Sequence, residues 1–210
     1  MFYSPVAWLV LIIFALLIGY DYANVFDSQL RAQSLGSGLW NVSSAIYNSW
    51  MTGILKPILR NLYLYIPLIT MGLMSREYQS GSIKLLYSSP VKNSSIIFGK
   101  YLAMMCYGAA LMSIIGLNVL FSWLTVENFQ ISMLLVGMLG IYLLILAYSA
   151  IGLFMSTITK YQVVAVVGTL AILAILNFIG GVGQEYDFVR DITYWLAISG
   201  RSEVFIDGMI

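Results

Sequence analysis

Long stretches without a charged side chain dominate this sequence. Each stretch is rich in Leu, Ile, Val and aromatic residues, and they cover 1–20, 61–75, 101–126, 128–159 and 161–184. A helix needs about 20 mainly apolar residues to cross the hydrocarbon core of a bilayer. The run at 61–75 is short, but it reaches that length if the helix begins near 57 and Arg60 extends its charged end to the interface. The pattern predicts five transmembrane helices, at about 3–20, 57–75, 101–124, 132–155 and 162–182.

Composition places the whole chain in lipid. Hydrophobic residues make up 60% of the 210 residues and charged residues only 9%, with a mean hydropathy of +0.90. Soluble domains are about 25% charged, so too little polar surface remains here to cover a water-soluble globule. The sequence therefore predicts an all-α, polytopic helical membrane protein with short interfacial helices, forming a single transmembrane domain over 1–210.

The residue types exclude several functions. The chain has no His, which removes His-based zinc sites and Ser-His-Asp triads. Its single cysteine, Cys106, has no intrachain disulfide partner, and a net charge of +1 argues against nucleic acid as a partner. We predict no catalytic, metal or cofactor-binding residue. A secondary transporter or channel is disfavoured, because such proteins usually place ionisable residues at membrane depth.

The loops differ in charge. A long polar loop is predicted over 21–56, whereas 76–100 is basic, with one acid, Glu77, among Arg76, Lys84, Lys92 and Lys100. Lys and Arg are divided five against five between the two sides of the membrane, so the positive-inside rule alone gives no orientation. The density of positive charge in 76–100 places this loop and the N-terminus in the cytoplasm, and the acidic segment 185–210 outside.

Within 76–100, local signals predict a turn and a short interfacial helix. The helix would end before Pro90. The turn falls at Ser80-Gly81-Ser82 and the apolar residues of the helix are Ile83, Leu85, Leu86 and Tyr87. Two interpretations remain open. The segment is either a connector whose basic residues touch anionic lipid or a docking element for a soluble partner.

Two further patterns concern the outer segment and the spans. Segment 185–198 has a helical apolar face, typical of an interfacial helix or of an external gate helix, made of Phe188, Ile192, Trp195 and Leu196. Gly152 and Ser156 form a small-xxx-small pair, and Gly108 belongs to a small-residue stretch. These residues favour close helix packing within the chain, with a dimer face as the alternative. Asn118 and Asn177 are expected to cross-link helices.

The order of residues over 71–100 resembles that of the permease subunits of ABC-2 type exporters, especially the gliding-motility-associated permeases of Bacteroidetes. After Glu77, the order is Ser80-Gly81-Ser82, Leu85-Leu86, Ser89-Pro90-Val91 and Gly99-Lys100. The strings FYSPVAWLVL and AIGLFMSTITKYQVVA are similar to the same family. Lys84 stands where the family often has Glu, so no specific ion pair is carried over to that position.

The resemblance implies a non-catalytic permease in the bacterial cytoplasmic (inner) membrane, with six spans and both termini cytoplasmic. Two permease copies or paralogues would bind two separate ABC ATPase subunits, which hold the ATP and Mg²⁺. The loop 76–100 would be the coupling helix, and the ATPase-coupling residues would be Arg76, Glu77, Ser80, Gly81, Ser82, Lys84, Leu85, Leu86, Ser89, Pro90 and Lys100.

Two expectations accompany this resemblance. The sequence stops at GRSEVFIDGMI, where the family would enter its sixth span, so we expect a chain truncated relative to the family. The function is expected to be ATP-driven export. The alternative is an ATP-driven component that passes mechanical work to an envelope machine of the gliding-motility type, without a transported substrate.

Overall fold

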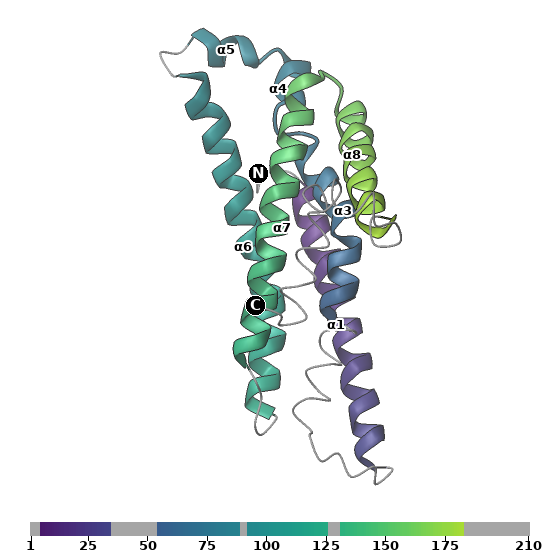
Figure 1. Ribbon diagram of the computed structural model, residues 1–210. Helices are drawn as coiled ribbons and strands as arrows, with labels where there is room; N and C mark the ends of the chain where they lie inside the picture. The colour runs from purple at the N-terminus through teal and green to yellow at the C-terminus, as the bar shows by residue number, and fades with distance from the viewer. Residues whose placement is uncertain (1–4, 35–53, 89–91, 126–130, 183–210) are drawn as a thin grey trace.

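The protein is a bundle of long helices, two of which are joined across one end of the bundle by two short helices. The computed structural model describes residues 5–34, 54–88, 92–125 and 131–182, and within these ranges the chain contains no strand (Figure 1). The all-α fold is therefore confirmed. The helices are α1 (Pro5–Ser34), α3 (Lys56–Thr70), α4 (Ser75–Ser80), α5 (Ile83–Ser88), α6 (Asn93–Thr125), α7 (Ile131–Ile158) and α8 (Gln162–Val182).

Among the described residues, three helices are long and apolar enough to cross a membrane. The qualifying segments are Pro5–Ser28, Asn93–Leu124 and Leu134–Ile158, and a shorter apolar helix covers Gln162–Phe178. These segments support a polytopic membrane protein. Helices α3 and α8 lie where the second and fifth spans are expected, but α3 is shorter than a full crossing, so five crossings stay a prediction.

Helix α1 is longer than the sequence pattern predicts. It continues to Ser34, so the prediction of a loop from residue 21 is wrong over 21–34. Charged residues end an apolar run but do not end a helix. Here the exposed side chains of Asp27 and Arg31 form an ion pair at 2.9 Å across one helical turn, which supports the polar extension. Tyr22 holds this part of α1 to α6 through an edge-on contact with Phe121.

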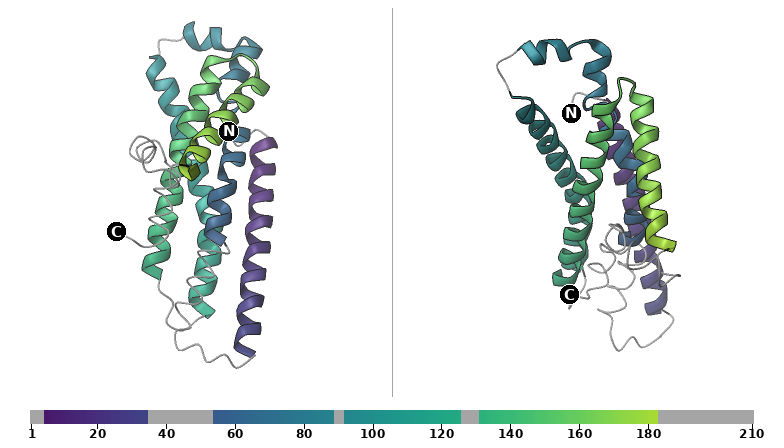
Figure 2. Two further views of the ribbon diagram at one scale, coloured as in Figure 1. Left: turned by 45° about the vertical axis from the view of Figure 1, so that its right-hand side comes forward. Right: turned by 45° about the horizontal axis from the view of Figure 1, so that its top comes forward.

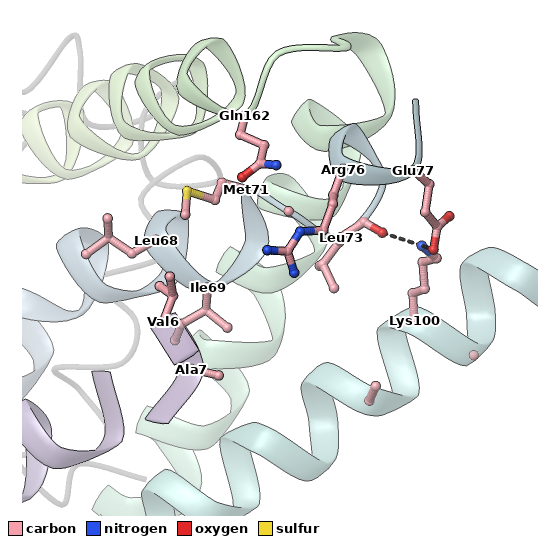
Figure 3. Close-up of a pocket in the computed structure, with 13 residues that line it drawn as sticks. Val6, Ala7, Leu68, Ile69, Met71, Leu73, Arg76, Glu77, Lys100 and Gln162 are labelled. Carbon is pink, nitrogen blue, oxygen red and sulfur yellow. Dashed lines mark hydrogen bonds and ion pairs between the residues drawn. The ribbon is translucent and has the colours of Figure 1, made fainter. Parts of the chain in front are cut away.

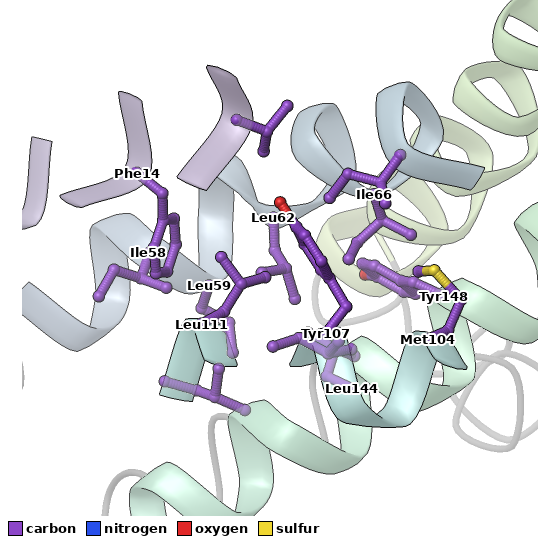
Figure 4. Close-up of a cluster of buried hydrophobic side chains, with 14 of the residues drawn as sticks. Phe14, Ile58, Leu59, Leu62, Ile66, Met104, Tyr107, Leu111, Leu144 and Tyr148 are labelled. Carbon is purple, nitrogen blue, oxygen red and sulfur yellow. The ribbon is translucent and has the colours of Figure 1, made fainter. Parts of the chain in front are cut away.

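Helix α3 packs against α1, α7 and α8 (Figures 1 and 2) and keeps one exposed apolar side, at Leu64 and Leu68. Its apolar side chains meet large residues from three other helices (Figure 4), and the buried side chains include Phe14, Leu62, Ile66, Tyr107 and Tyr148. The hydroxyl of Tyr107 donates a hydrogen bond to the Ala7 carbonyl oxygen at 2.8 Å. This bond satisfies a buried polar group and joins α6 to the start of α1.

The outer surface is apolar, as a lipid environment requires. Large hydrophobic side chains point away from the core along all the long helices, among them Leu16, Leu117, Phe154, Val163 and Phe178. Water-soluble monomers rarely expose contiguous apolar patches of more than a few hundred Å². The helical backbone satisfies its own polar groups, so such a surface is stable against hydrocarbon.

Small residues allow close helix approach within the chain. A Cβ atom on Gly152 of α7 would lie 2.2 Å from Thr70 Oγ1 on α3, and one on Gly108 would lie 3.0 Å from an Ile145 methyl carbon. Packing within the chain is thus confirmed at both positions. The two asparagines differ: Asn177 donates to the Tyr148 hydroxyl at 3.3 Å and so links α8 to α7, but the expectation is wrong for Asn118, which bonds a carbonyl of its own helix.

Candidate functional site

Helices α4 and α5 lie across one end of the bundle and connect α3 with α6 (Figures 1 and 2). Most of the residues singled out in 76–100 belong to this region. Arg76, Glu77 and Ser80 are on α4, Lys84, Leu85 and Leu86 are on α5, and Lys100 is near the start of α6. Ser89 and Pro90, and the expected gate residues Phe188, Ile192, Trp195 and Leu196, lie outside the described residues.

The turn between α4 and α5 is the one that the sequence predicts. Gly81 has φ +73°, a left-handed conformation that favours glycine, and it caps the end of α4. The hydroxyl oxygens of Ser80 and Ser82 are 2.6 Å apart and share a hydrogen bond across the turn. Helix α5 then begins at Ile83 and ends at Ser88, two residues before Pro90.

The N-terminus of α4 is capped by a residue from α7. The backbone N–H groups of Met74 and Ser75 donate to Ser156 Oγ, at 3.0 and 3.1 Å. The same hydroxyl donates to the Met71 carbonyl oxygen at 3.0 Å. Met74, the residue at the N-cap position, makes no side-chain capping bond itself. Ser156 therefore satisfies two of the N–H groups that a helix start leaves unpaired.

An ion pair joins α4 to α6. Lys100 Nζ lies 2.5 Å from Glu77 Oε1, and it also donates to the Leu73 carbonyl oxygen. Both side chains are largely shielded, with 17% of Lys100 and 28% of Glu77 exposed. Shielding strengthens such a pair relative to a surface one. Glu77 also lies in the first turn of α4, where a negative charge complements the helix dipole.

A third polar contact joins α4 to α8. The side-chain amide of Gln162, the first residue of α8, donates to Gln79 Oε1 at 3.3 Å. Helix α4 is thus attached by side-chain hydrogen bonds or ion pairs to α6, α7 and α8, while the chain itself connects it to α3.

These contacts were only partly visible in the sequence. Glu77 and Lys100 belong to one predicted site, and the structure brings their side chains together. The capping role of Ser156 and the contact of Gln162 were missed, because they join segments more than 80 positions apart. The small-xxx-small pair that includes Ser156 indicates close packing, but no local pattern reports which backbone groups a hydroxyl will reach.

A comparison with protein families identifies the architecture. The family model described as ABC-2 family transporter protein matches residues 1–184. The chain belongs to the ABC-2 transporter family. No curated protein and no solved structure matches it. Family membership makes the chain a multi-pass permease subunit of an ABC transporter and implies an ABC ATPase partner.

In this ABC-2 permease, α4 and α5 present an exposed polar surface away from the bundle. Gln79, Ser80, Lys84 and Ser88 are exposed on these two helices. Their other contacts hold them to the long helices, as described above. Within the described ranges, no group of three His, Cys, Asp or Glu side chains is placed to hold a metal ion.

Proposed function

We propose that this ABC-2 permease couples ATP hydrolysis by a separate ATPase subunit to export of a substrate across the bacterial inner membrane. Helices α4 and α5 would lie in the cytoplasm with the N-terminus and would be the surface that the ATPase contacts. The permease itself catalyses no reaction. ATP and Mg²⁺ are held by the partner, and two permease copies or paralogues form the translocating dimer.

The observation that carries this proposal is the attachment of α4 to four long helices. Force from an ATPase needs a surface element that is exposed on one side and fixed to the membrane helices on the other. Helix α4 has both properties: Gln79 and Ser80 are exposed, and Glu77 contacts Lys100 of α6. Ser156 extends the connection into α7. Rigid elements joined by such contacts are the physical route by which helices shift together.

Site-specific photo-crosslinking in native membranes tests the proposal. The crosslinker replaces Lys84, exposed on α5, or in a matched control Leu30, exposed at the opposite end of α1. We expect an ATP-binding protein to be captured from position 84 and not from position 30. Capture from position 30 alone would contradict both the orientation and the coupling surface.

The substrate question needs a separate measurement. ATP hydrolysis by the purified complex would be followed with and without a membrane extract that contains candidate cargo. Stimulation by a component of the extract supports export. ATP turnover that no component of the extract changes supports the mechanical alternative.

A further inference from the structure

A cavity of about 350 Å³ lies beneath α4, where α3 ends and α1, α6 and α8 begin (Figure 3). Its volume is at the lower end of the range for small-molecule sites. One wall is apolar and comes from α1 and α3, with Val6, Leu68 and Ile69. The opposite wall is polar and comes from α4, α6 and α8, with Arg76, Lys100 and Gln162.

The cavity carries a surplus of one positive charge. Its lining contains two cations, Arg76 and Lys100, and one acid, Glu77. The acid is paired with Lys100 through Oε1 at 2.5 Å, while its Oε2 is buried and makes no hydrogen bond to a described residue; the surplus positive charge therefore resides on Arg76. Figure 3 shows the Arg76 guanidinium directed into the space between α3 and α6, and no described residue pairs with it. A guanidinium binds phosphate oxygens through two parallel hydrogen bonds, which Lys cannot do.

The position of the cavity favours a lipid over a soluble anion. It lies at the end of the bundle where the apolar runs meet the charged segment. Leu68, on its apolar wall, is 41% exposed, and Leu64, one turn earlier on α3, is 44% exposed, so an exposed apolar strip of α3 begins at the cavity. Trp8, next to the lining residue Ala7, is 53% exposed, and exposed Trp is typical of the headgroup level. A soluble anion would gain nothing from this apolar rim.

We propose that this cavity binds the phosphodiester headgroup of an anionic glycerophospholipid from the adjacent leaflet. Arg76 bonds the phosphate, the Gln162 amide faces the polar part of the headgroup, and the acyl chains lie along the exposed side of α3. One phosphodiester charge neutralises the one surplus cation. Basic pockets between membrane helices are a recognised means of retaining anionic lipids. Binding needs only this chain and a bilayer, so it is independent of the ATPase proposal.

Lipid titration monitored by native mass spectrometry tests the site. The purified full chain is titrated with phosphatidylglycerol and, separately, with phosphatidylcholine. The test variant is Arg76→Gln. The matched control is Arg31→Gln, which removes the same charge from an exposed Arg at the far end of α1. We expect phosphatidylglycerol to bind in preference to phosphatidylcholine, and its affinity to fall about tenfold in R76Q, the effect of losing one charge-assisted bonding pair, but not in R31Q.

Further arms make each outcome decisive. Arg76→Lys keeps the charge but loses the bidentate geometry, so an intermediate loss is expected, and thermal unfolding of each variant checks its fold. Equal losses in R76Q and R31Q, or no preference for phosphatidylglycerol, would overturn the site. Competition by sn-glycerol 3-phosphate or inorganic phosphate at concentrations equal to those of the lipid would assign the cavity to a soluble phosphate ligand and overturn the lipid proposal.

Discussion

Ser156 caps the helix that begins at Ser75, although the two residues are 81 positions apart and belong to different helices. Both side chains are fully buried, so no water replaces the bond when the hydroxyl is removed. The Ser156 hydroxyl accepts hydrogen bonds from two N–H groups and donates one to a carbonyl oxygen. It thus uses its one donor and both of its acceptor sites.

Removal of this hydroxyl should destabilise the protein. In Ser156→Ala, two buried N–H groups lose their acceptor, and we expect a loss of about 1–3 kcal/mol in the free energy of unfolding. The measurement is reversible unfolding in detergent. The control is Thr157→Ala, whose hydroxyl bonds only a carbonyl of its own helix. Equal stability of S156A and T157A would show that the cap contributes nothing.

The close contact of α7 with α3 predicts intolerance of even a methyl group. In Gly152→Ala the new Cβ would meet the Thr70 side chain at 2.2 Å, and overpacking of this kind costs about 1–3 kcal/mol. Gly19→Ala is the matched control, because a Cβ there meets nothing within 4 Å, and it should be neutral or slightly stabilising.

A double mutant then tests the cause. If the clash is responsible, Thr70→Ala should recover part of the stability lost in Gly152→Ala, giving a favourable coupling energy between the two sites. Strictly additive losses in the double mutant would place the strain elsewhere.

The pairing of Glu77 with Lys100 predicts a charge-dependent effect on the complex. Glu77→Lys replaces the ion pair with two cations that face each other at contact distance. Helix α4 should therefore detach from α6, and ATP turnover by the co-purified ATPase should fall. Insertion of the permease into membranes should persist. The charge-swapped variant, Glu77→Lys with Lys100→Glu, should regain part of the turnover. Unchanged ATPase binding and turnover in E77K would refute the coupling role.

The exposed face of α5 predicts a different phenotype. Lys84 is exposed, so Lys84→Glu should leave the unfolding free energy within about 0.5 kcal/mol of wild type, as surface substitutions usually do. Co-purification of the ATPase should nevertheless decrease. The control is Arg31→Glu, a similar charge reversal in the last turn of α1, at the end of the bundle away from α5. It should not affect co-purification. Loss of the ATPase in both variants would indicate a general charge effect.

Much of the fold follows from the hydrophobic runs, because each long apolar segment has to be helical in lipid. The bounds of α8, Gln162–Val182, coincide with those expected for the fifth span. The pattern failed at α1, where Asp21 ends the charge-free run and the helix continues. The length of a charge-free run reflects the thickness of the bilayer's hydrocarbon core. The length of a helix also depends on local pairs such as Asp27 with Arg31.

In the candidate site, too, local features could be predicted from the sequence, whereas contacts between distant helices could not. The Gly81 turn and the short helix after it are local features, and their residue types were sufficient to predict them. The attachment of α4 depends on side chains such as Ser156 and Gln162, which reach α4 only after α7 and α8 have packed. The gliding-motility resemblance stays a prediction.

The three bonds of Ser156 also determine how α4 and α7 separate. All three bonds involve the same buried oxygen. Water therefore cannot replace one of them while the other two remain. Partial loosening leaves buried polar groups without partners and is costly. The joint between the two helices should therefore be all-or-none: α4 either moves with α7 as one body or releases it completely, which gives the permease two discrete states instead of a continuum.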